Sequence, residues 1–145
     1  MTSTQVALTL RLLVDAVELV VENSGPGPLR VWDRENSWGW RSLELEVSPD
    51  ADGDWIRLVP RERIWTRNLP VAVEIAPGGR HSFVVRGGSD SEWDAVERVR
   101  HLRDERMRVR GSLRIPPSAE AEEHRVFVGE VTSPVYVSDP PHGWL

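Results

Sequence analysis

Short segments in which apolar residues occupy every second position recur along the chain. In residues 5–14, Leu8 and Leu10 fall on one face, while Thr9 and Arg11 fall on the other. Successive side chains of a β-strand point to opposite sides of the sheet, so this spacing is typical of a strand with one buried and one solvated face. The chain is therefore predicted to consist mainly of strands.

Residues that end regular structure separate these segments. Residues 23–28 break any regular element, because their Pro residues lack backbone N–H donors and their Gly residues favour turns. Asp52-Gly53 predicts a tight hairpin turn, and Pro77-Gly78-Gly79 predicts a second hairpin. The predicted strands are residues 5–14, 17–22, 29–33, 38–48, 55–59, 71–75, 80–86, 106–115 and 125–138, the last as one strand or a pair.

One segment, residues 91–102, carries a helical pattern. Ser91 can cap a helix, and Trp93, Val96 and Val99 follow at three-residue spacing. The expected helix has only about three turns, so its stability would depend on docking rather than on helix propensity. Residues 116–123 are predicted to be an acidic loop.

Seven to nine short strands with one short helix predict an all-β fold. Because the strands alternate with turns rather than helices, a parallel α/β sheet is disfavoured and an antiparallel β-sandwich is expected. A β-barrel is the alternative. The 145 residues suit a single domain, which buries roughly 68–70% of its unfolded surface at this size, with a Pro-rich tail at residues 139–145.

Two turns resemble those of bacterial immunoglobulin-like modules. Residues 21–25, Val-Glu-Asn-Ser-Gly, followed by Pro-Leu-Arg-Val at 28–31, are similar to the turn between the second and third strands of such modules. Residues 75–79, followed by the strand at 81–85, are similar to a later proline-glycine turn, also found in intracellular proteinase inhibitors of the β-sandwich type. The resemblance spans residues 6–137 as a pattern. It implies an immunoglobulin-like, non-enzymatic module that binds another protein, and it carries over no site residue.

The composition excludes several function classes. The chain has no Cys, so it has no disulfide, thiol nucleophile or thiolate metal site. It also has no Lys, because all 18 basic residues are Arg, and this excludes a Schiff-base lysine and a phosphate-binding P-loop lysine. The net charge of −5 argues against nucleic acid or an anionic membrane surface as the main partner.

The remaining chemistry-bearing residues form no recognisable catalytic or metal-binding arrangement. The four His residues lack metal-ligand spacing, and the chain has no G-x-S-x-G elbow. We therefore expect no enzymatic activity, no metal and no cofactor. The N-terminus lacks the form of a signal peptide and no apolar run approaches the length of a membrane span, so a cytoplasmic location is expected.

Trp is the candidate binding residue, because the chain has seven Trp against one Tyr and two Phe. The strand alternation places Trp32, Trp38 and Trp40 on solvated faces, where an apolar patch rimmed by charge marks a recognition surface. Core packing is the other interpretation, since a bulge at Gly39 would reverse the register and bury one of them.

The irregular segment around Trp65 is a second candidate, because loops carry binding residues more often than strands do. Its alternative role is to anchor the loop at the edge of the fold. Trp144 at the C-terminus is expected either to pack on the body of the fold or to enter a partner.

We expect a protein–protein interaction module, such as an inhibitor or accessory domain. Carbohydrate binding by the same Trp residues, with Arg41 and Glu44, is the alternative. The predicted binding residues are Trp32, Trp38, Trp40, Trp65, Arg67 and Asn68.

A stripe of Arg residues lies on one face of the strand at 106–115. It is either a polyanion-binding face or a solvated face whose Arg pair with Glu on neighbouring strands. The negative net charge favours the pairing. The stripe consists of Arg106, Arg108, Arg110 and Arg114.

Overall fold

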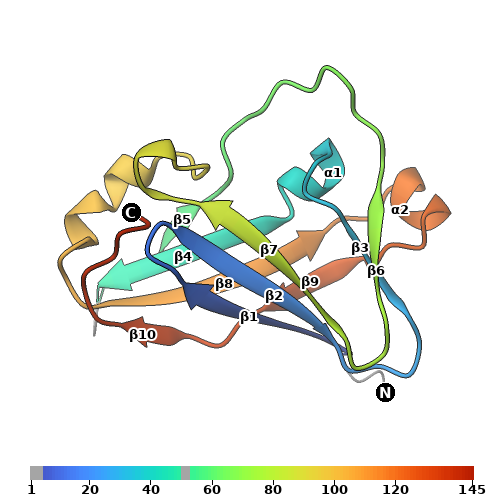
Figure 1. The fold of residues 1–145 in the computed structure, drawn as a ribbon, viewed down its shortest axis with the longest axis horizontal. Helices are drawn as coiled ribbons and strands as arrows, with labels where there is room; N and C mark the ends of the chain where they lie inside the picture. Colours follow the sequence, from blue (N-terminus) through green and yellow to red (C-terminus); the bar gives the residue numbers. More distant parts are fainter. Residues whose placement is uncertain (1–4, 50–52) are drawn as a thin grey trace.

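The computed structural model describes residues 5–49 and 53–145, which form ten strands and two short α-helices (Figure 1). The fold is mainly β, as predicted, with one strand more than the seven to nine expected. The strands are β1 (Val6–Leu12), β2 (Ala16–Asn23), β3 (Leu29–Trp32), β4 (Leu43–Pro49), β5 (Ile56–Leu58), β6 (Ala72–Ile75), β7 (Arg80–Arg86), β8 (Met107–Ile115), β9 (Gly129–Thr132) and β10 (Tyr136–Ser138). The helices are α1 (Ser37–Trp40) and α2 (Ala119–Glu123).

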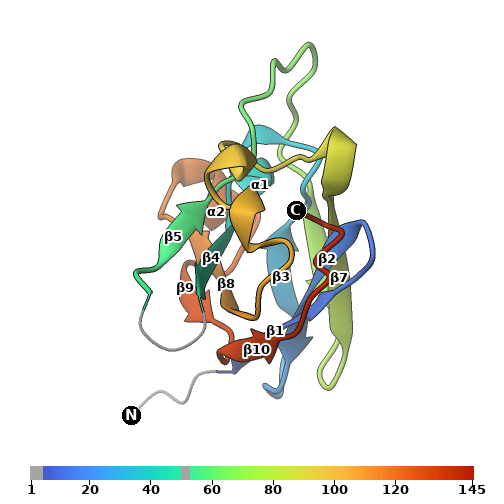
Figure 2. The same ribbon diagram turned by 90° about the vertical axis from the view of Figure 1, so that its left-hand side faces the viewer.

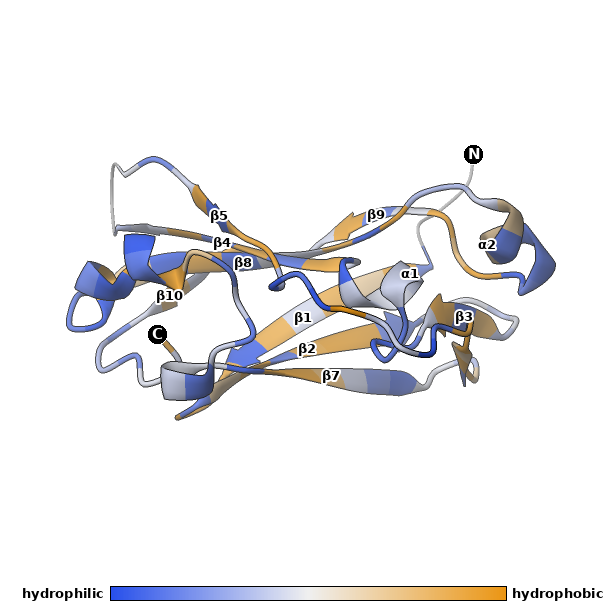
Figure 3. Ribbon diagram, turned by 90° about the horizontal axis from the view of Figure 1, so that it is seen from above, coloured by the Kyte–Doolittle hydropathy of each residue, from blue (hydrophilic) through white to orange (hydrophobic). Residues whose placement is uncertain are grey.

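The strands form three antiparallel sheets. One has the order β1-β2-β7, a second has the order β10-β8-β4-β5 with β9 also paired to β8, and β3 pairs with β6 alone. Figure 3 shows β4, β5, β8 and β9 in one layer, and β1, β2 and β7 in another. Across the described residues these sheets do not close on themselves, so the β-barrel alternative is wrong.

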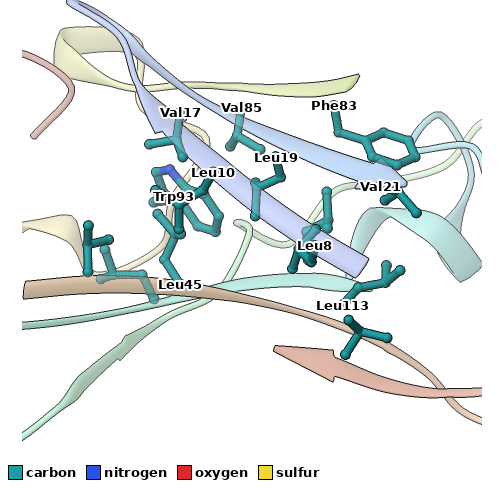
Figure 4. Packing of buried hydrophobic residues seen from close by; sticks show 14 of the residues in the cluster. Leu8, Leu10, Val17, Leu19, Val21, Leu45, Phe83, Val85, Trp93 and Leu113 are labelled. Atoms are coloured by element: carbon teal, nitrogen blue, oxygen red, sulfur yellow. The ribbon is translucent and has the colours of Figure 1, made fainter. Parts of the chain in front are cut away.

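The space between the two larger sheets is filled by the apolar positions of the alternating segments. Leu19 from β2 and Leu45 from β4 are fully buried, and Figure 4 shows them facing each other across the core beside Trp93. Gly111 in β8 lies opposite β2, and a Cβ atom there would come within 2.6 Å of the Leu19 Cδ2 atom. The predicted burial of alternate residues in these strands is therefore confirmed.

The single helix predicted at residues 91–102 is wrong. The segment instead contains two separate 3₁₀ turns, at 96–98 and 100–102, and a third lies just before it at 88–90. Ala95 has a left-handed backbone with φ of 55°, which interrupts a helix at this point. Trp93 forms a β-bridge with Pro60, and the Ser91 hydroxyl accepts a hydrogen bond from the Trp93 N–H instead of capping a helix.

The two α-helices lie where other structure was predicted. The strand expected from residue 38 begins at Leu43, because Asn36 caps α1 by accepting a hydrogen bond from the Gly39 N–H. Only glycine fits at position 39, where a Cβ atom would lie 1.8 Å from the Asp33 carbonyl oxygen. The predicted acidic loop likewise contains α2, whose cap is the Ser118 side chain.

One of the two predicted hairpins does not form. The turn around Pro77-Gly78 is present, but the strands that flank it pair with different partners: β6 with β3, and β7 with β2. β4 and β5 do pair as an antiparallel hairpin. The Asp52 half of its predicted turn lies outside the described residues.

The C-terminal segment packs onto the body of the fold. Trp144 is fully buried, which confirms the first of its two expected roles, and its carbonyl oxygen accepts a hydrogen bond from the Gly88 N–H. His142 is also buried, and its Nε2 lies 2.8 Å from the Glu105 carbonyl oxygen. Among residues 5–49 and 53–145, no helix has the length and apolar character needed to cross a membrane.

Two residues of the Arg stripe, Arg110 and Arg114, pair with Glu on neighbouring strands as the second interpretation predicted, whereas Arg108 donates to the Ser48 hydroxyl instead. Arg110 contacts Glu46 on β4 at 3.1 Å, and Arg114 contacts Glu130 on β9 at 3.4 Å. The guanidinium carbons of Arg108 and Arg110 also lie 4.8 and 4.1 Å from the centre of the Trp55 ring. These contacts are typical of a solvated sheet face.

Candidate functional site

The predicted Trp residues do not form one exposed platform. Trp32 is only 2% exposed, so the expectation that it faces solvent is wrong. Its strand is covered on both sides: Val31 packs into the core, while the Trp32 ring centre lies 5.9 Å from that of Trp38 and 5.6 Å from that of His124. Core packing is therefore the correct interpretation for Trp32.

Trp40 is also buried, at 6% exposure, because the helical turn of α1 rotates it away from the surface expected of a strand. Its indole N–H donates to the Arg61 carbonyl oxygen at 2.7 Å. Its ring lies 6.2 Å from the ring of Trp65 in an edge-on arrangement, centre to centre. The Trp40 ring is thus held in place and forms the surface on which the segment around Trp65 packs.

That segment is the long connection between β5 and β6, residues 59–71, which we call the β5–β6 loop. It rises away from the sheets in both views of the ribbon (Figures 1 and 2). Connections of this length without secondary structure of their own are uncommon in compact domains and are usually either functional loops or disordered linkers. Fixed contacts along the loop favour the first. The contacts that fix its path therefore define the candidate site.

The β5–β6 loop is fastened at several points. Arg63 forms an ion pair with Glu35 at 2.9 Å, and its guanidinium carbon lies 4.4 Å from the centre of the Trp65 ring. Near the other end of the loop, the Asn68 side chain accepts from the Ser37 N–H and donates to the Ser37 hydroxyl. Trp65 and Asn68 are thus brought to the same site as Trp40, and Asn68 acts there as an anchor.

The outward side of the loop is apolar and basic. Ile64 is 93% exposed, although the residues on either side of it, Arg63 and Trp65, are held by the contacts above. Arg67 is exposed on the same loop, while Leu69 and Val71 are about half exposed. Ile64 was not predicted as a site residue from the sequence. The one feature that could have indicated it is an apolar side chain in a segment with no apolar periodicity.

A buried ion pair lies beneath the loop. The side chain of Arg34 is 8% exposed and that of Glu92 is 14% exposed, with 3.7 Å between Arg34 Nη1 and Glu92 Oε2. The Arg34 guanidinium carbon also lies 4.5 Å from the centre of the Trp40 ring. Burial lowers the pKa of Arg34, and the carboxylates of Glu92 and Glu35 act in the opposite direction.

This ion pair covers the edge of β7 that does not pair with β2. Arg34 donates to the Val84 carbonyl oxygen at 3.1 Å, and Glu92 accepts from the Arg86 N–H at 2.6 Å. The Glu92 N–H in turn donates to the Arg86 carbonyl oxygen. The pair therefore links the base of the loop to a sheet edge that would otherwise expose unpaired backbone groups.

Replacing Trp65 by Ala is expected to loosen the loop without unfolding the protein. Loss of the aromatic and cation–π contacts of Trp65 is expected to raise the population of the open loop about tenfold. Trypsin should then cleave after Arg63 and Arg67 about ten times faster, which peptide mass spectrometry measures. Trp55→Ala, which removes a half-buried Trp that packs on Arg108 and Arg110 and not on the loop, is the control. Equal cleavage rates in the two variants would contradict the anchoring role.

Within residues 5–49 and 53–145, no group of three His, Asp or Glu side chains is arranged to hold a metal ion.

No protein-family model, curated protein or solved structure matches the chain.

Proposed function

We propose that this protein is a binding module for another protein, with the β5–β6 loop as its recognition element. The layered antiparallel sheets support the further proposal that the scaffold is an immunoglobulin-like β-sandwich. The observation that carries the functional proposal is the exposure of Ile64 on a loop whose neighbouring residues are fixed.

Fixing a loop before binding favours affinity, because less conformational freedom is lost when the complex forms. An exposed apolar side chain on such a loop can enter a pocket of a partner, which is where binding energy concentrates in protein interfaces. In this loop, the contacts among Trp40, Arg63 and Trp65 hold the backbone in place, and Ile64 is the apolar side chain that would enter the pocket.

The charge of the loop restricts the partner surface. Residues 59–71 contain three Arg and one Glu, whereas the whole chain carries a net charge of −5. Arg61 and Arg63 pair with Glu97 and Glu35 outside the loop, so Arg67 carries the charge that would face a partner. It favours an apolar pocket with a carboxylate at its border, since complementary charges speed encounter and suppress wrong partners.

The test compares Ile64→Glu with Val14→Glu. Val14 is 86% exposed in the β1–β2 turn, so the two variants add the same charge at equally exposed apolar positions. Immobilised wild-type protein and Val14→Glu should retain the same partner from a cell extract, while Ile64→Glu should retain at least tenfold less. Both variants should unfold within about 0.5 kcal/mol of the wild type. Equal retention by the two variants would contradict the proposal.

A further inference from the structure

We propose that a cleft beside α1 binds an acidic monosaccharide, a pyranose that carries a carboxylate. The cleft has a volume of about 340 Å³, within the range of small-ligand sites. Ile64 is not among its lining residues, so the inference does not depend on the proposed protein-binding function. Its lining includes Trp32, Trp38, Pro116, Arg41, Arg114 and Ser118.

Aromatic and proline side chains form the apolar part of the cleft. Trp38 is half-buried and packs on Trp32, so its ring is held in place by the fold. Pro116 lies in the segment between β8 and α2 and adds to the same apolar lining. One face of a pyranose ring presents mainly C–H groups, and a fixed indole ring offers that face a flat apolar surface.

Two Arg residues lie on the rim of the cleft and are held only by exposed partners. Arg41 is paired with Glu62 and Arg114 with Glu130, and all four side chains are exposed. Exposed pairs of this kind contribute little free energy, so a ligand carboxylate can replace either partner at small cost. A guanidinium binds a carboxylate through two parallel hydrogen bonds, which gives the ligand a fixed orientation.

The acidic residue of the cleft does not cancel the charge of either Arg. Glu44 lines the same cleft, but both of its carboxylate oxygens accept hydrogen bonds from Arg57. Its charge is therefore balanced by a residue outside the lining. Arg41 and Arg114 are balanced only by the exposed Glu62 and Glu130, so an anionic ligand can compete for these two guanidinium groups where a neutral ligand cannot.

Two hydroxyl groups favour a sugar over an aromatic acid. The Ser37 hydroxyl accepts a hydrogen bond from Asn68, and the Ser118 hydroxyl accepts one from the Ala121 N–H. Each hydroxyl therefore keeps its own proton for donation. An aromatic carboxylate such as benzoate has no ring hydroxyls to accept these protons, whereas a uronic acid has several.

The experiment is a titration of ¹⁵N-labelled protein with glucuronate, followed through the indole N–H resonances. The Trp38 signal is assigned as the one missing from Trp38→Phe. We expect glucuronate to shift it in a saturable manner, and glucose and benzoate at the same concentration to leave it in place. Arg114→Gln should weaken glucuronate binding about tenfold. Arg80→Gln, which removes an exposed Arg on β7, should leave it unchanged.

Three results would overturn the inference. The first is no shift of the Trp38 signal at tens of millimolar glucuronate. The second is an equal response to glucose or a stronger one to benzoate, which would contradict the charge or the sugar assignment. The third is equal weakening by Arg114→Gln and Arg80→Gln, which would place binding elsewhere. Arg114 is exposed, so Arg114→Gln is expected to fold and the test does not depend on a core substitution.

Discussion

Trp93→Ala is expected to lower the free energy of unfolding by about 3–5 kcal/mol, a large share of the stability of a domain of this size. Trp93 is fully buried and lies between the two large sheets, close to Leu10 and Val17 (Figure 4). Its backbone bridge to Pro60 also holds residues 92–94 beside the chain that leaves β5. Urea unfolding followed by circular dichroism measures the loss.

A conservative variant, Trp93→Phe, distinguishes the cost of leaving a cavity from the effect of losing the indole N–H. Trp93 Nε1 is buried and has no hydrogen-bond partner among the described residues, so Trp93→Phe removes an unsatisfied donor while keeping much of the ring. We expect it to cost less than half as much as Trp93→Ala. Trp55→Ala, at a half-buried position on the sheet surface, should cost about 1 kcal/mol. Equal losses for Trp93→Ala and Trp55→Ala would show that Trp93 is not a core residue.

Glu92→Ala is expected to destabilise the protein by about 3–5 kcal/mol, because it leaves the Arg34 guanidinium buried without its counter-charge. Two nitrogens of Arg34, Nε and Nη2, are already buried with no hydrogen-bond partner among the described residues. The variant would also free the Arg86 N–H that Glu92 binds. Guanidinium chloride is unsuitable as the denaturant because it screens charge, so the measurement uses urea.

Replacing both partners tests the cause of this loss. The double variant Arg34→Met, Glu92→Gln removes the buried charges together, and we expect it to be more stable than Glu92→Ala alone. The exposed pair of Arg63 and Glu35 is the control, and Glu35→Gln should cost less than about 1 kcal/mol. A loss from Glu92→Ala no larger than that from Glu35→Gln would contradict the role of the buried pair.

Local patterns predicted the strands well, because alternation directly reflects which side of a strand is buried. The residues of β2 and β4 that were expected to face the core do so. The pairing of β6 and β7 could not be predicted in this way. The Pro77-Gly78 turn is set by local backbone preferences, whereas the partner of each strand is set by residues far away in sequence.

The candidate site was predicted in part. Trp40, Trp65 and Asn68 were recognised as candidates and do come together, but their shared role is to hold a loop and not to form an exposed platform. The error arose at Gly39, whose lack of a Cβ atom lets the Asp33 carbonyl lie close to α1. Alternation of apolar residues cannot reveal a helical turn of this kind. Arg34 was missed because nothing in its local sequence indicates burial beside a carboxylate distant in the chain.

The closure of the β7 edge has a consequence for how the protein folds. Arg34 and the Val84 carbonyl that it covers are 50 residues apart, so the cover forms only after a long-range contact is made. The hairpin of β1 and β2 is local, whereas β7 joins it across a longer stretch of chain than the one between Arg34 and Val84. The open edge of the hairpin and the β7 edge therefore both wait for long-range contacts. A partly folded chain would then present a free strand edge to its neighbours. The hazard of self-association therefore lies in the refolding protein, and dilution during refolding should raise the yield even though the native sheet edge is covered.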